Sequence, residues 1–99
     1  MSGLFDLSGK VAVITGSTKG IGKAMAERMA EHGAKVVISS RKADVCEDVA
    51  EAIRAKGGEA MAIPCNISDQ AQLEILVNKT LAAWGGIDVL VCNAAANPY

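Results

Sequence analysis

The chain has 99 residues, of which 51% are hydrophobic and 21% charged, with only three aromatic side chains and a formal net charge of −1. This balance excludes a disordered segment, and the near-neutral charge offers no basic surface for nucleic acid or an anionic membrane. No apolar run reaches the ~18 residues that a membrane span needs, so we expect a globular chain with neither nucleic acid nor membrane as a partner.

Four short apolar runs predict the strands of one sheet. They cover residues 11–14, 36–38, 60–63 and 89–92. The first run is apolar without alternation, which is typical of a parallel strand covered on both faces.

Three helix-length segments separate these runs. The first is expected over residues 20–31, with Ile21, Met25 and Met29 on its core face, and it stops at Gly33. The second is expected to end at residues 57–58 after a stripe made of Val45, Val49 and Ile53.

The third segment has the clearest stripe and an expected start at Asp69. Its apolar positions are Leu73, Leu76, Val77, Thr80, Leu81 and Trp84. Asp69 and Gln72 have the spacing of a capping box, in which each side chain pairs with the other's backbone N–H. Strands that alternate with helices in this way predict an α/β fold with right-handed crossovers and a parallel sheet.

A glycine-rich turn follows the first predicted strand, in the sequence Thr-Gly-Ser-Thr-Lys-Gly-Ile-Gly over residues 15–22. Such a turn presents free backbone N–H groups at a positive helix N-terminus, where a pyrophosphate binds well. We expect Gly16 to permit the tight turn, Gly20 to let the phosphates approach, and Gly22 to let helix and strand pack closely.

Two other phosphate-binding patterns fit this turn less well. A Walker A loop would need a glycine where Ser17 stands and a hydroxyl where Ala24 stands, so a P-loop NTPase is disfavoured. The dinucleotide pattern G-x-G-x-x-G is not matched either, because the glycines are Gly16, Gly20 and Gly22.

The observed spacing resembles the signature of the short-chain dehydrogenase/reductase family. The resemblance continues through residues 7–10, 65–69 and 93–95 and covers the whole chain. It implies a Rossmann-like doubly wound parallel sheet with strand order 3-2-1-4. The cofactor-binding residues that it implies, together with the charge argument below, are Gly16, Thr18, Lys19, Gly20, Ile21, Gly22, Ser40, Arg41, Lys42, Asn66, Ile67, Asn93, Ala94 and Ala95.

The end of the second predicted strand favours NADP(H) over NAD(H). An acid at this place accepts hydrogen bonds from the ribose hydroxyls, whereas a basic residue accommodates a 2′-phosphate. The chain reads Ser40-Arg41-Lys42 here, with no acid between Lys35 and Asp44. Because Arg makes paired charge-assisted hydrogen bonds, Arg41 is the expected phosphate ligand.

The family's pattern is altered at two places that matter for cofactor binding. Asn66 stands where the family usually has Asp, and its amide oxygen can still accept a hydrogen bond from the adenine amino group. After the fourth strand the chain reads Cys92-Asn93-Ala94-Ala95 in place of the usual Asn-Asn-Ala-Gly. These strings most resemble the NADP-dependent carbonyl and retinal reductase branch.

The family's catalytic Ser and Tyr-x-x-x-Lys have no counterpart in this chain, whose one Tyr is the terminal Tyr99. We therefore expect residues 1–99 to be the N-terminal half of a dinucleotide-binding domain, from an oxidoreductase that acts on a carbonyl or alcohol. The alternative is a non-catalytic dinucleotide-binding module that works through a partner. No metal site is predicted, and the family resemblance implies a homo-oligomer.

Cysteine usage and the amino terminus favour a cytoplasmic protein. Cys46, Cys65 and Cys92 form no C-x-x-C pair and no disulfide framework. Residues 1–6 lack both the basic and the long apolar region of a secretory signal. We therefore expect buried free thiols in a reducing compartment.

Overall fold

The computed structural model of the chain describes residues 6–16 and 20–92. Its elements alternate as the sequence predicts. The four strands are β1 (Val11–Thr15), β2 (Lys35–Ser39), β3 (Glu59–Ala62) and β4 (Val89–Cys92). The three helices are α1 (Gly20–Glu31), α2 (Ala43–Ala55) and α3 (Gln70–Trp84).

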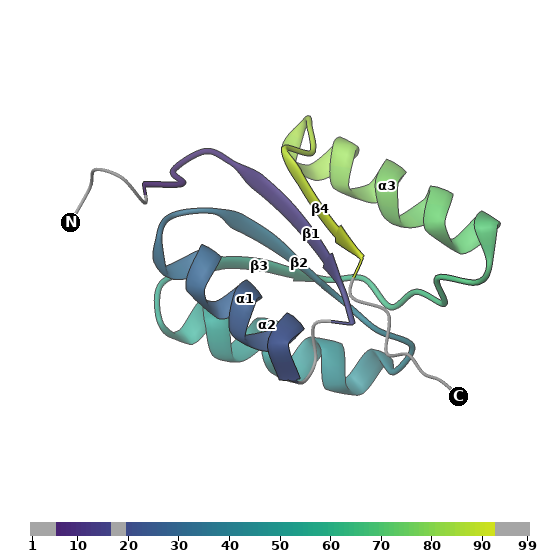
Figure 1. Ribbon diagram of the computed structural model, residues 1–99, viewed down its shortest axis with the longest axis horizontal. Helices are drawn as coiled ribbons and strands as arrows, with labels where there is room; N and C mark the ends of the chain where they lie inside the picture. Colours follow the sequence, from purple (N-terminus) through teal and green to yellow (C-terminus); the bar gives the residue numbers. More distant parts are fainter. Residues whose placement is uncertain (1–5, 17–19, 93–99) are drawn as a thin grey trace.

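The strands form one parallel sheet in the order β3-β2-β1-β4, which confirms the predicted order. Val13 on β1 lies beside Val37 on β2 and Leu90 on β4. Helices α1 and α2 cover one face of the sheet and α3 lies on the other (Figure 1). The sheet is therefore the middle layer of three, and every residue of β1 is buried.

Each face of the sheet has its own apolar core, because successive strand side chains point to opposite faces. Toward α1 and α2, Ile14 and Ile38 are fully buried together with Val36. Toward α3, Val13 and Val37 pack with Leu76. The hydrophobic effect thus holds β1 and β2 in place from both sides, and these strands carry the turns that form the candidate site.

The expected core face of α1 is wrong by one position. The residues that the helix buries are Gly22, Ala26 and Ala30. Ile21 is 74% exposed, and Met29 is only partly buried where it packs against the core. Small residues let the helix backbone lie close to the sheet, whereas long side chains at the contact would hold it away. Gly22 is one of these buried positions, and its role in close packing stays a prediction.

The stripe predicted on α3 is confirmed in its centre and wrong at one position. Leu76 and Thr80 are buried, and Leu73 and Trp84 pack against the same core. Leu81 is 43% exposed, so it lies outside the buried face. The buried face of α3 is therefore narrower than the stripe of apolar residues.

The start of α3 confirms one half of the predicted capping box. The Asp69 carboxylate accepts hydrogen bonds from the backbone N–H groups of Ala71 (3.0 Å) and Gln72 (3.4 Å). The side chain of Gln72 does not return to the Asp69 N–H, which donates to the Asn66 carbonyl instead. Gln72 Oε1 accepts from the Asn66 N–H at 2.7 Å, so the helix start is tied to the loop that precedes it.

Replacing the cap of α3 should weaken the fold. Asp69→Ala removes the acceptor for two backbone N–H groups, and we expect it to lower the free energy of unfolding by about 1 kcal/mol. Urea unfolding followed by far-UV circular dichroism measures this loss. Asp69→Ser keeps a capping oxygen and should stay close to the parent protein; an equal loss in both variants would contradict the capping role.

Strand β4 ends the sheet in the described part of the chain, with β1 as its single neighbour there. Leu90 on this strand is 58% exposed. Among the described residues, no helix combines the length and the apolar character that crossing a bilayer requires.

Candidate functional site

The predicted binding segments follow the carboxyl ends of neighbouring strands. Because all four strands are parallel, Gly16, Ser40 and Asn66 lie past the same edge of the sheet, where ligands of open α/β sheets bind. The backbone ties the segments together, since Cys65 N–H donates to the Ser40 carbonyl at 2.8 Å. On the other side, Thr15 Oγ1 donates to the Val91 carbonyl at 3.3 Å. We call this edge the carboxyl edge.

The glycine turn joins β1 to α1 at the carboxyl edge. Gly16 and Gly20 have φ of 66° and 65°, a backbone conformation that side chains with a Cβ rarely adopt. A Cβ placed on Gly20 would meet no described atom within 4 Å, so the space in front of this residue is open. An exposed glycine at a helix N-terminus with open space before it fits a pyrophosphate.

Arg41 and Lys42 lie between β2 and α2, and both are exposed. Within the described residues, neither side chain makes a hydrogen bond or an ion pair. Lys42 is the N-cap residue directly before α2, and its N–H donates to Ser40 Oγ at 3.3 Å. Two cations at a helix N-terminus oppose the helix dipole, so this arrangement favours the binding of an anion.

The Cys46 thiol supports this turn, a role that the sequence did not reveal. Cys46 is fully buried, and its Sγ lies 3.2 Å from Ser40 Oγ and 3.7 Å from the Ser40 carbonyl oxygen. The thiol therefore fixes the Ser40 hydroxyl, which in turn pairs with the Lys42 N–H. A cysteine in the first turn of the following helix is the only sequence signal for this contact.

Asn66 follows β3 and is held by three hydrogen bonds. Its Oδ1 accepts from the Ser68 N–H at 3.0 Å, its N–H donates to Gln72, and its carbonyl accepts from the Asp69 N–H at 2.9 Å. The oxygen expected to meet the adenine amino group thus already has a partner. The neighbouring Ile67 is 36% exposed, so its apolar side chain is accessible beside Asn66.

Cys65 lies directly before Asn66 and is buried. Burial raises the pKa of its thiol, and the negative charge of Asp69 raises it further. Since the thiolate is the nucleophilic form of cysteine, Cys65 is a structural residue of this loop rather than a reactive one.

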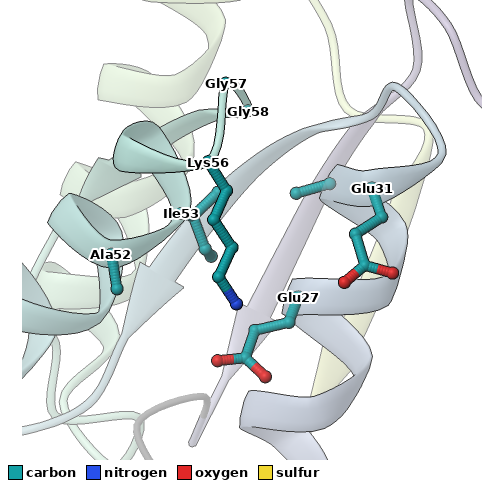
Figure 2. A pocket seen from close by; sticks show the side chains of 8 residues that line it. Glu27, Glu31, Ala52, Ile53, Lys56, Gly57 and Gly58 are labelled. Carbon is teal, nitrogen blue, oxygen red and sulfur yellow. The ribbon is translucent and has the colours of Figure 1, made fainter.

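A hollow lies between α1 and α2, away from these residues (Figure 2). It measures about 140 Å³, and Lys56 points across it toward Glu27. Glu31 ends α1 and residues 57–58 precede β3, so this hollow lies at the amino edge of the sheet. None of the residues predicted to bind the cofactor lines it, and we do not place the site there.

Five predicted site residues fall outside the described residues. They are Thr18, Lys19, Asn93, Ala94 and Ala95. The structure does bring together the segments that carry the others, namely Gly16, Gly20, Ile21, Gly22, Ser40, Arg41, Lys42, Asn66 and Ile67. Among the described residues, no three His, Cys, Asp or Glu side chains gather as a metal site.

Comparison with known proteins extends these observations. The family model described as short chain dehydrogenase matches residues 10–98. The chain is 50% identical over 93 residues to the short-chain dehydrogenase/reductase SDRA of Arabidopsis thaliana, covering 93% of this chain and 36% of that protein. It is 45% identical over 93 residues to dehydrogenase/reductase SDR family member 4 of Oryctolagus cuniculus, covering 94% and 36%.

A solved structure agrees with the fold as well. A metagenomic short-chain oxidoreductase in complex with NADP superposes with a TM-score of 0.86 at 41% identity, covering 92% of this chain and 41% of that one. The chain thus spans about a third of the length of the curated relatives that it matches. From its first strand to the segment after its fourth, the chain belongs to the short-chain dehydrogenase family.

Proposed function

We propose that the chain forms the NADP(H)-binding portion of an oxidoreductase that transfers hydride reversibly between a nicotinamide ring and a carbonyl or alcohol substrate. One observation carries the proposal. Gly20, with open space before it at the start of α1, and the two cations at the start of α2, whose side chains pair with none of the described residues, lie past the ends of adjacent strands. A dinucleotide with a 2′-phosphate needs both features on one edge of a sheet.

The preference for NADP(H) over NAD(H) rests on charge. A 2′-phosphate carries up to two negative charges, and the guanidinium of Arg41 can pair with two of its oxygens. No acid stands between Lys35 and Asp44 to bind a free 2′-hydroxyl. The metagenomic relative bound to NADP supports the same cofactor.

Different groups of the described residues would bind different parts of the dinucleotide. The backbone around Gly16 and Gly20 would hold the pyrophosphate, with Ile21 beside it. Ser40, Arg41 and Lys42 would hold the 2′-phosphate, and Asn66 with Ile67 would contact the adenine. When bound, the nicotinamide supplies or accepts the hydride, and these residues hold it in position for that step.

In the proposed enzyme, the substrate pocket is formed by residues outside this chain. We propose a small carbonyl or alcohol compound as substrate, a cytoplasmic location and a homo-oligomeric enzyme with neither nucleic acid nor membrane as a partner. The second candidate is a dinucleotide-binding module that works without catalysis through a partner.

A turnover assay on the natural polypeptide separates the two candidates. The polypeptide is incubated with NADPH and a panel of ketones and aldehydes, and loss of NADPH absorbance is followed. We expect oxidation that depends on the carbonyl compound and reverses with the matching alcohol and NADP⁺. Tight NADPH binding without turnover on any carbonyl would favour the module instead.

A further inference from the structure

The side-chain amide of Asn66 has a fixed orientation. A backbone N–H can pair only with the amide oxygen, because the amide nitrogen is a donor and has no lone pair to offer. The 3.0 Å contact from the Ser68 N–H therefore requires Oδ1 to face the turn formed by residues 66–69. The same turn is closed by the Asp69 N–H on the Asn66 carbonyl.

The other branch of the amide is Nδ2, which carries two N–H donors. Within the described residues no acceptor pairs with it, although the Asn66 side chain is half-buried. Asn66 comes just past β3 at the carboxyl edge, on the far side of Ser40 from the glycine turn. A dinucleotide lying along this edge from the glycine turn past Ser40 would bring its purine to this amide.

We infer that Asn66 is a specificity-determining residue that offers a hydrogen-bond donor to the purine, so that the site accepts a 6-oxo purine at least as well as adenine. The inference rests on the proposed function, because it takes a dinucleotide to bind at the carboxyl edge. It reverses the direction of the hydrogen bond expected from sequence, in which Oδ1 accepts from the adenine amino group.

The chemistry of the two bases explains the preference. Adenine has an amino group at position 6, which is a donor, and a ring nitrogen beside it that accepts. The Nδ2 donor of Asn66 cannot form a hydrogen bond with this amino group, because both groups are donors. It would have to donate to the ring nitrogen instead. Hypoxanthine has a carbonyl oxygen at position 6, which accepts from Nδ2 directly. A carboxylate at residue 66 would reverse this order, because its second oxygen accepts from the adenine amino group.

The test compares NADPH with its hypoxanthine analogue. Both are titrated against the natural polypeptide, and the ratio of their two dissociation constants is the readout. We expect the parent protein to bind the analogue at least as tightly as NADPH. Asn66→Asp should shift the ratio toward NADPH by about fivefold, which is the change in affinity expected from one hydrogen bond at a partly buried site. Asn66→Ala should shift it in the same direction by a smaller factor.

Ser68→Ala is the matched control, since it removes the hydroxyl but keeps the backbone N–H that orients Asn66. Its ratio should equal that of the parent protein. An unchanged ratio in both the Asp and the Ala variants of residue 66 would overturn the inference while leaving NADPH binding intact. If the parent protein bound neither nucleotide, the proposed function would fail, and the inference with it.

Discussion

Arg41→Asp should weaken NADPH binding about 100-fold and leave NADH binding within about threefold of the parent protein. The substitution removes charge-assisted hydrogen bonds to the 2′-phosphate, each of which contributes about 1.5–3 kcal/mol. It also places a negative charge where the phosphate would lie, and every 1.4 kcal/mol is tenfold in affinity. NADH has a hydroxyl at this position, so the new carboxylate can accept from it.

Lys79→Asp is the control for the change in net charge. Lys79 is an exposed residue of α3, on the opposite side of the sheet from α2. Lys79→Asp makes the same reversal of charge away from the candidate site. It should change the dissociation constants of NADPH and NADH little at physiological ionic strength, since exposed charges are screened beyond ~8 Å. Equal losses for NADPH and NADH in Arg41→Asp would contradict the assignment of Arg41 to the 2′-phosphate.

Gly20→Val should reduce the affinity for both nucleotides about 100-fold, because its side chain would fill the open space before α1 and exclude the pyrophosphate from several backbone N–H groups. The substitution should also lower the free energy of unfolding moderately, through the backbone conformation at residue 20. No described atom lies within 4 Å of the added Cβ, so the strain comes only from a φ of 65° and is about 1–3 kcal/mol.

Gly57→Val separates backbone strain from loss of the phosphate site. Gly57 also has a positive φ, 93°, and open space around its Cβ, but it lies at the amino edge of the sheet. The two variants should lose similar unfolding free energy in urea, and only Gly20→Val should lose nucleotide affinity. If both bound NADPH as the parent protein does, the glycine turn would not be the phosphate site.

The strands and helices could be predicted from sequence because their signals are local, whereas the strand order was implied by the family resemblance. Apolar runs without alternation marked the strands, and glycines and an Asp cap marked the helix ends. The alternation of strands and helices then leaves few arrangements, because parallel crossovers are right-handed. It was harder to predict from the sequence which face of each helix packs against the sheet. In α1 the small residues Ala26 and Ala30 face the sheet, and a search for large apolar residues selected the neighbouring positions.

The candidate site was predicted as a set of segments but not in its contacts. Gly20 and Arg41 are identified by residue type and by their place after a strand. The pairing of Cys46 with Ser40 and of Gln72 with Asn66 depends on how a helix returns to the loop before it. Such contacts join residues six positions apart through a turn whose shape the sequence pattern does not specify. For this reason the orientation of the Asn66 amide emerged only from the structure.

Titration of the unmodified polypeptide with NADPH and with NADH shows whether the carboxyl edge binds a dinucleotide and which one it prefers. Binding of reduced nucleotide is followed by its fluorescence or by calorimetry, at one salt concentration for both. We expect one saturable site that binds NADPH at least tenfold more tightly than NADH, with a preference that declines as salt screens Arg41 and Lys42. Equal affinity for the two nucleotides would contradict the cofactor assignment, and no saturable binding of either would contradict the nucleotide site itself.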